Sequence, residues 1–138
     1  MSVFVDCNII IDWLSDRKPH SEYAKRFLNL VEEGVCNAVV SPLVLTNVYY
    51  IVRKLKNRKV AQSLMIDISN LFEVCSVTKE DIDQATAIAK GDFEDVVHYQ
   101  TAIRTKVEAI ITRNKKDFPQ GKIKILTAKE YLEKRQYK

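Results

Sequence analysis

Three acidic segments of this chain have the composition of a metal site, and the first contains Asp6. Asp6 directly follows the apolar residues 3–5 and precedes the isoleucine run at positions 9–11, which favours a helix. An aspartate between a strand and a helix can cap the helix, a role worth about 1 kcal/mol. The position also suits a metal ligand, because parallel sheets bind ligands beyond the carboxyl ends of their strands. Taken alone, Asp6 leaves both interpretations open.

The second segment, residues 91–95, reads Gly-Asp-Phe-Glu-Asp and precedes a predicted helix that ends near Lys106. Carboxylates in the first turn of a helix complement its dipole, by about 0.3 to 1 kcal/mol each. One N-cap is sufficient, however, and Asp92 can fill it with Asp95 at the third helical position. Glu94 and Asp95 are then not needed for capping, so one of them can face the strand ends.

The third segment, residues 112–118, reads Thr-Arg-Asn-Lys-Lys-Asp-Phe and directly follows an apolar run at 109–111. An ordinary solvated loop is one explanation. The alternative is a functional loop with two kinds of group. Oxygen ligands come from Asn114 and Asp117, and cations that can bind phosphate groups come from the basic residues, namely Arg113, Lys115 and Lys116.

Short β-branched runs alternate with longer amphipathic stretches along the whole chain. Strands are predicted at 3–5, 38–40, 72–77, 109–112 and 123–126. Helices are predicted at 22–33, 42–56, 59–71, from Thr78, from Asp92 and from Thr127, with Ser41 as an N-cap. Strands separated by helices favour right-handed crossovers and a mostly parallel sheet, so the expected fold class is α/β, a three-layer α/β/α sandwich.

A parallel sheet would bring the three acidic segments to one rim. Two unpaired carboxylates 4 Å apart repel by about 4 kcal/mol at an effective dielectric constant of 20, more than capping contributions offset. A bound cation removes this repulsion, and oxygen ligands favour hard ions such as Mg²⁺ or Mn²⁺ over zinc. We therefore expect a divalent metal where the three segments meet, bound by Asp6, by Glu94 or Asp95, and by Asp117.

Composition favours one soluble domain that spans residues 1–138. The 138 residues are 46% hydrophobic and 29% charged, which is too apolar for a disordered chain. The N-terminus lacks a basic signal-peptide region, and no run of 18 apolar residues predicts a membrane span, so we expect a cytoplasmic protein. Cys7, Cys36 and Cys75 lack zinc-binding spacing and are interpreted as buried small hydrophobes. A net charge of +4 is compatible with nucleic acid without requiring it.

Four segments, taken together and in order, resemble the PIN domain family. They are residues 3–8 (Val-Phe-Val-Asp-Cys-Asn), 40–50, 92–95 and 112–118, and they cover almost the whole chain. PIN domains are α/β/α nucleases, and many are VapC-type toxins that cut RNA and are held inactive by a small antitoxin protein. The resemblance implies that Asp6, Asp95 and Asp117 are metal-site acids with Asn114 beside them, and it also implies a homodimer.

The chain departs from the family at position 47. The helix after Ser41 usually presents a glutamate to the metal, whereas this sequence has Asn47 at the matching place. An amide oxygen can ligate Mg²⁺ directly or through water, but it brings no negative charge. Since asparagine is a poor helix former, a polar role for Asn47 is one explanation, and a solvent-facing side chain is the other.

With this resemblance, the observations predict a metal-dependent ribonuclease, and the resemblance implies that it is the toxin of a toxin–antitoxin module. The expected reaction is in-line phosphodiester hydrolysis, for which the resemblance implies a 3′-hydroxyl and a 5′-phosphate as products. Arg113, Lys115 and Lys116 are expected to hold substrate phosphates. The alternative is a weakened PIN-like domain that binds RNA or a protein partner. A phosphoacceptor receiver domain needs an aspartate at the end of its central strand, and it is disfavoured because Thr78 follows the 72–77 run, with no acid before Glu80. A phosphatase with Asp-x-Asp after its first strand is disfavoured because position 8 is Asn.

Overall fold

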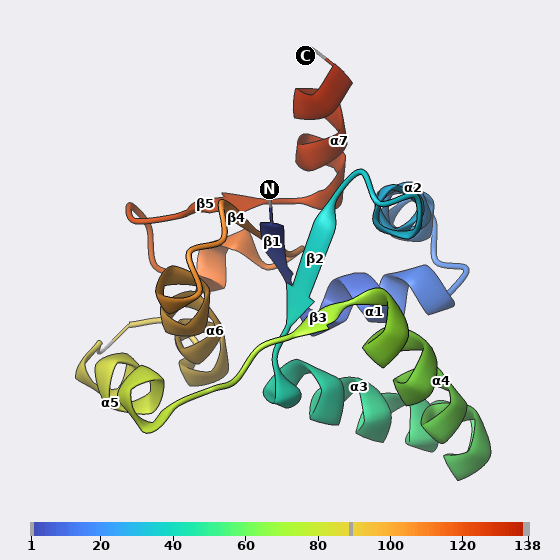
Figure 1. The fold of residues 1–138 in the computed structure, drawn as a ribbon, viewed down its shortest axis with the longest axis horizontal. Coiled ribbons are helices and arrows are strands. Elements are labelled where there is room, and N and C mark those ends of the chain that lie inside the picture. The colour runs from blue at the N-terminus through green and yellow to red at the C-terminus, as the bar shows by residue number, and fades with distance from the viewer. Residues whose placement is uncertain (1, 89, 137–138) are drawn as a thin grey trace.

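The described residues, 2–88 and 90–136 of the computed structural model, form a five-stranded parallel sheet (Figure 1). The strand order is β3-β2-β1-β4-β5, and every neighbouring pair is parallel. The strands are β1 (Ser2–Val5), β2 (Asn37–Val40), β3 (Glu73–Val74), β4 (Ala109–Ile111) and β5 (Lys124–Leu126). The crossover from β3 to β4 passes over β2 and β1, and β1 is the central strand of the sheet.

Helices cover both faces of the sheet, with α5 and α6 on one side and α1 and α2 on the other (Figure 1). This arrangement confirms the expected α/β/α sandwich. The helices are α1 (Cys7–Leu14), α2 (His20–Glu32), α3 (Pro42–Leu55), α4 (Arg58–Leu71), α5 (Lys79–Ala87), α6 (Phe93–Arg104) and α7 (Ala128–Gln136), and a short 3-10 turn, η1, covers Lys115–Asp117.

The inner strands are apolar because helices exclude water from both of their faces. Val3, Phe4 and Val5 of β1 are fully buried, as are Ile110 and Ile111 of β4. The register places Val5 beside Ile111, so β1 and β4 end at the same level. Whatever follows these two strands therefore emerges side by side.

The strand predicted at 72–77 was wrong in length, because β3 contains only Glu73 and Val74. Both residues are exposed at the edge of the sheet. Val77 leaves the sheet and packs with the small apolar cluster formed by α5 and α6. Packing against helices therefore competes with strand extension for this β-branched run.

The cysteines were expected to be buried, and the structure confirms this for Cys36 alone. Cys7 and Cys75 are half-buried, and all three are free thiols. Cys7 begins α1 and Cys75 follows the edge strand β3, two places that solvent partly reaches. Within the described ranges, no helix has the length and apolar character needed to cross a bilayer.

Replacing Ile110 with alanine should destabilise the protein by about 3 kcal/mol, because the cavity in β4 lies between Phe4 and Ile125 and cannot collapse. Urea unfolding followed by circular dichroism measures the loss. The control is Ile66→Ala on α4, where the side chain is 63% exposed and the expected loss is below about 0.5 kcal/mol. Equal losses for the two variants would contradict the assignment of β4 to the core.

Candidate metal centre

Asp6 and Thr112 are the first residues beyond the carboxyl ends of β1 and β4. The parallel register continues past the strands, since the Asp6 backbone N–H donates to the Ile111 carbonyl at 3.1 Å. Asp6 is 2% exposed and Thr112 is fully buried. Two residues 106 positions apart in the sequence are thus in contact because their strands are neighbours.

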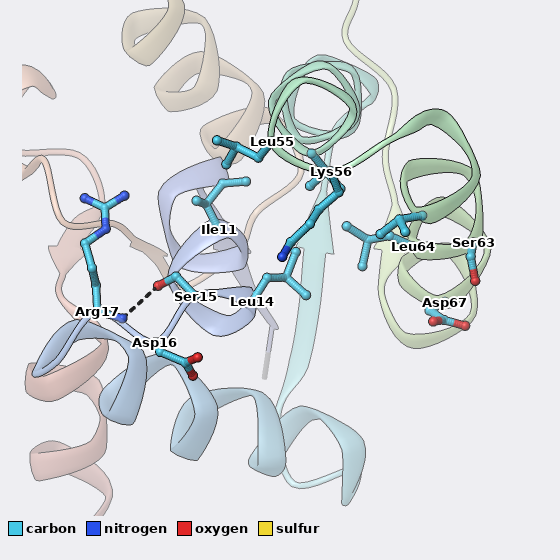
Figure 2. Close-up of a pocket in the computed structure, with 12 residues that line it drawn as sticks. Ile11, Leu14, Ser15, Asp16, Arg17, Leu55, Lys56, Ser63, Leu64 and Asp67 are labelled. Carbon is cyan, nitrogen blue, oxygen red and sulfur yellow. Dashed lines mark hydrogen bonds between the residues drawn. The ribbon is translucent and has the colours of Figure 1, made fainter.

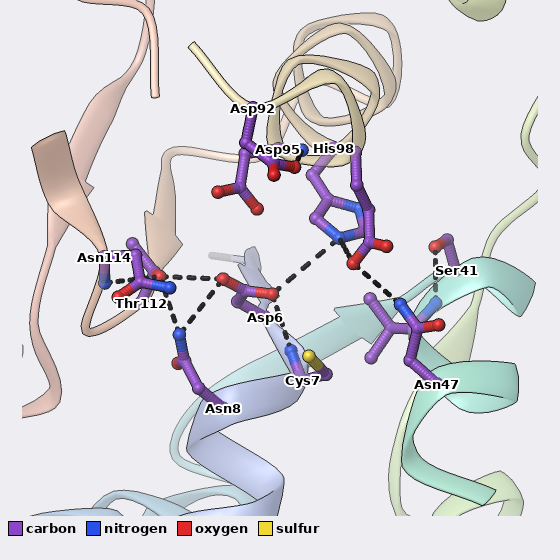
Figure 3. Close-up of polar contacts among 12 residues, drawn as sticks. Asp6, Cys7, Asn8, Ser41, Asn47, Asp92, Asp95, His98, Thr112 and Asn114 are labelled. Atoms are coloured by element: carbon purple, nitrogen blue, oxygen red, sulfur yellow. Dashed lines mark hydrogen bonds and ion pairs between the residues drawn. The ribbon is translucent and has the colours of Figure 1, made fainter. Parts of the chain in front are cut away.

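Three donors hold the Asp6 carboxylate in one orientation (Figure 3). The Cys7 N–H donates to Oδ1 at 2.7 Å, while the Thr112 hydroxyl and the Asn8 amide donate to Oδ2 at 2.8 and 3.3 Å. Asp6 is therefore the N-cap of α1, as one interpretation of the sequence required. It also presents Oδ1 to α6, so the capping role and the role in the pocket are compatible.

The start of α6 supplies Asp95 from above this carboxylate. Asp92 is the N-cap and accepts from the Asp95 N–H at 3.3 Å, which confirms the predicted capping arrangement. Asp95 is only 7% exposed and points toward Asp6 in Figure 3. Burial, and after it the charge of Asp6, raises the pKa of Asp95 to about 7.

Gly91 allows the start of α6 to approach η1. Its φ of +75° favours glycine, and a Cβ at this position would lie 2.7 Å from the carbonyl oxygen of Asp117. The close contact brings Asp117 near the pocket, and the Asp117 charge contributes to the raised pKa of Asp95. The Asp117 side chain is half-buried.

His98 is a site residue that the sequence analysis missed. It is fully buried one helical turn after Asp95, and its ring packs against Phe4 with 5.4 Å between centroids. Neither ring nitrogen has a hydrogen-bond partner within residues 2–88 and 90–136. Nε2 lies 3.7 Å from Asp6 Oδ1 and 3.6 Å from Glu94 Oε1. The spacing Asp95-x-x-His98, which places both side chains on one helix face, was the available signal.

Together these side chains fit a divalent cation. Asp6, Asp95 and His98 each offer a ligand atom, and the three atoms lie within 4.8 Å of one another. Buried carboxylates that repel, together with an unpartnered buried imidazole, are groups that a positive ion would satisfy. The expected ligand set of oxygens alone thus gains a nitrogen, and Asp117 lies outside this group of three.

Asn47 and Asn114 approach the pocket from two different sides. Ser41 caps α3 as predicted, and Asn47 lies on this helix with its amide donating to Glu94 Oε1 at 2.7 Å. The His98 ring, and then the Asn47 amide, lower the pKa of Glu94 below its usual range. Asn114 is exposed, and its backbone N–H donates to the Thr112 hydroxyl at 3.0 Å.

Two of the three loop cations already have carboxylate partners. Arg113 binds the buried Asp12 through Nε and Nη2 at 2.6 and 3.1 Å, and Lys115 binds Glu130 at 2.8 Å. Lys116 is exposed and forms no ion pair with any residue that the structure describes. The pairs attach the loop to α1 and α7, so phosphate binding by Arg113 or Lys115 would compete with these contacts.

Comparison with known proteins gives consistent matches along the chain. A family profile described as PIN domain matches residues 2–116. Ribonuclease VapC1 of Aquifex aeolicus is 27% identical over 137 residues, which cover 96% of this chain and 94% of that protein.

Two solved structures illustrate the similarity of fold. A toxin–antitoxin complex from Klebsiella pneumoniae has a TM-score of 0.68 at 22% identity and covers 91% of this chain and 97% of that chain. Mycobacterium tuberculosis VapC20, described as a Sarcin-Ricin loop cleaving toxin, has a TM-score of 0.63 at 16% identity. The match covers 78% of this chain and 86% of the VapC20 chain.

The raised pKa of Asp95 predicts the pH dependence of stability in the metal-free protein. The pKa is about 7 in the folded chain against an ordinary 3.8, so between these values the folded state holds a proton that the unfolded state releases. The free energy of unfolding should therefore fall as pH rises from 4 to 7. Asp95→Asn should remove this trend and stabilise the protein at pH 8 by about 2 kcal/mol.

Urea unfolding at several pH values, in the presence of a chelator, tests this expectation. The control is Asp67→Asn, which removes an exposed acid on α4. An unchanged pH profile in Asp95→Asn would show that the carboxylates are not gathered as described.

Proposed function

The chain belongs to the PIN domain family, and on this premise we propose that it is an endoribonuclease that hydrolyses RNA phosphodiester bonds with Mg²⁺ or Mn²⁺. We propose further that residues 1–138 act as a single domain in the cytoplasm. The observation that carries the proposal is the buried group of Asp6, Asp95 and His98, whose ligand atoms lie within 4.8 Å of one another. The names of the relatives, Ribonuclease VapC1 and the toxin VapC20, support RNA as the substrate class.

Each residue of the pocket has a role in this proposal. Asp6, Asp95 and His98 would hold the ion, and Thr112 and Asn8 fix the Asp6 carboxylate so that Oδ1 lies near His98. Asp117 adds negative charge from η1. When bound, a divalent ion lowers the pKa of water and offsets the charge that develops on the phosphate. Carboxylates favour Mg²⁺ or Mn²⁺, and the imidazole makes Mn²⁺ the better match of the two.

Exposed groups beside the pocket are proposed to hold the RNA. Lys116 is the loop cation best placed to bind phosphate, since its charge is not used by an ion pair with a described residue. Asn114 offers a neighbouring amide. Arg113 and Lys115 are assigned a supporting role, because their contacts with Asp12 and Glu130 fix the loop that carries Lys116.

A small antitoxin protein is the proposed partner. The toxin–antitoxin title of the Klebsiella structure supports a partner of this kind. An open hollow of about 630 Å³ lies between α1, α3 and α4. Figure 2 shows Ile11, Leu14 and Leu55 among the side chains that line it, together with polar residues such as Asp16 and Lys56. Leu55 is 70% exposed, which is unfavourable for an isolated chain and suits a site that an apolar segment covers. We therefore place the antitoxin in this groove.

The main alternative is a domain that binds RNA or a partner without efficient cleavage. It would be favoured if purified protein failed to cut single-stranded RNA with Mn²⁺ while an Asn47→Glu variant cut it well. One cleavage assay on these two proteins therefore distinguishes an active ribonuclease from a domain that only binds.

Asp6→Asn should reduce Mn²⁺-dependent cleavage of single-stranded RNA by about 100-fold or more, because a ligand charge is lost while the remaining amide oxygen can still accept the Cys7 N–H and cap α1. Mn²⁺ binding, measured by calorimetry, should weaken in parallel. The control Asp83→Asn removes an exposed acid on α5 and should leave both quantities unchanged. Unaltered metal affinity in Asp6→Asn would reject the site.

Leu55→Asp should weaken binding of the antitoxin at least tenfold, since a charge in an apolar contact is desolvated without a partner. The DNA beside the gene for this chain is first searched for a small reading frame, and the product of such a frame is the partner for this assay. Ile66→Asp is the control, because Ile66 is 63% exposed on α4 but does not line the groove. RNA cleavage by the free protein should be unchanged in both variants. Equal binding by Leu55→Asp and wild type would place the partner elsewhere.

A further inference from the structure

Glu94 faces the same atom as Asp6 does. Its Oε1 lies 3.6 Å from His98 Nε2, and Asp6 Oδ1 lies 3.7 Å from that nitrogen. His98 is fully buried, and neither of its ring nitrogens has a hydrogen-bond partner among the described residues, so the pocket contains an unsatisfied nitrogen in addition to its carboxylates. The carboxylates of Glu94 and Asp6 thus approach one unsatisfied group from two different elements, α6 and the end of β1.

The Asn47 amide holds Glu94 in this orientation. Its Nδ2 donates to Glu94 Oε1 at 2.7 Å across 47 positions of sequence, and Figure 3 shows Asn47 reaching from α3 toward the pocket. The Glu94 side chain remains 40% exposed, so its carboxylate lies between the buried ligands and solvent. That is where an ion held by buried residues would remain accessible to a substrate.

A helix start does not by itself explain this contact. Glu80 occupies the same second position of α5 and is exposed, and the structure gives its side chain no hydrogen bond or ion pair with a described residue. Both glutamates complement a helix dipole, whereas Glu94 alone of the two is directed by an amide toward a buried histidine. The comparison within one chain separates the dipole contribution from the contribution of the pocket.

We propose that Glu94 is a further ligand of the divalent ion and that Asn47 is the residue that positions it. The inference rests on the proposed metal-dependent function and adds one carboxylate to it. Position 47 then contributes a hydrogen-bond donor, and the negative charge is supplied by α6. The donor and the acid form a pair whose roles can be exchanged, because the atoms are in direct contact.

The test measures Mn²⁺ affinity by calorimetry in the full chain. Glu94→Gln, which keeps the size of the side chain, should weaken Mn²⁺ binding about tenfold or more. Asn47→Glu alone should not strengthen it, since two carboxylates would then meet at the 2.7 Å contact. The double variant Asn47→Glu/Glu94→Gln, which exchanges acid and amide, should restore affinity to within about threefold of wild type. Glu80→Gln is the matched control and should bind as wild type does.

Each outcome bears on one of the two proposals. If Glu94→Gln binds Mn²⁺ like wild type while Asp6→Asn does not, the role of Glu94 is rejected and the metal centre stands. If the double variant binds no better than Glu94→Gln, the positioning role of Asn47 is rejected. If wild type itself fails to bind Mn²⁺, the metal-dependent function fails first. Thermal unfolding with a chelator confirms that every variant compared is folded.

Discussion

Repulsion between buried carboxylates is the constraint on which this site depends. Asp6 and Asp95 are almost inaccessible to solvent, yet both approach the same small volume. Two such charges 4 Å apart repel by about 4 kcal/mol at an effective dielectric constant of 20. The hydrogen bonds from Cys7 and Thr112 orient Asp6 without adding positive charge. Burial, and after it the charge of Asp6, raises the pKa of Asp95 to about 7. A bound divalent cation would offset the repulsion between the two carboxylates. The same acids therefore destabilise the metal-free fold and provide ligands for a catalytic ion.

The fold keeps the acids together through contacts that are individually ordinary. Parallel pairing of β1 with β4 sets Asp6 beside Thr112. The left-handed backbone at Gly91, where no Cβ fits, lets α6 begin against η1. These backbone constraints determine the geometry of the pocket before any ligand is present, and ligand side chains that are fixed in advance lose little conformational entropy on binding.

The polar loop after β4 serves stability as well as function. Arg113 neutralises the buried Asp12, an acid that would otherwise be costly to bury, and Lys115 joins Glu130, which also accepts from the Thr127 N–H in α7's capping turn. Cations that look equivalent in the sequence thus differ in availability. On α3, Asn47 looks like the loss of an acid, whereas in space it contacts the acid of another helix.

Sequence by itself determined the fold class, the order of strands and helices, the caps at Asp6, Ser41 and Asp92, and the metal-site candidates Asp6 and Asp95. Periodicity and capping are local properties, so a linear pattern records them. Tertiary structure alone decided which distant groups meet: His98 with Asp6, Glu94 with Asn47, and Arg113 with Asp12. It also limited β3 to two residues, because Val77 packs against α5 and α6 and does not extend the edge strand. Contacts between residues 47 to 106 positions apart depend on strand order and helix docking, which no local pattern encodes.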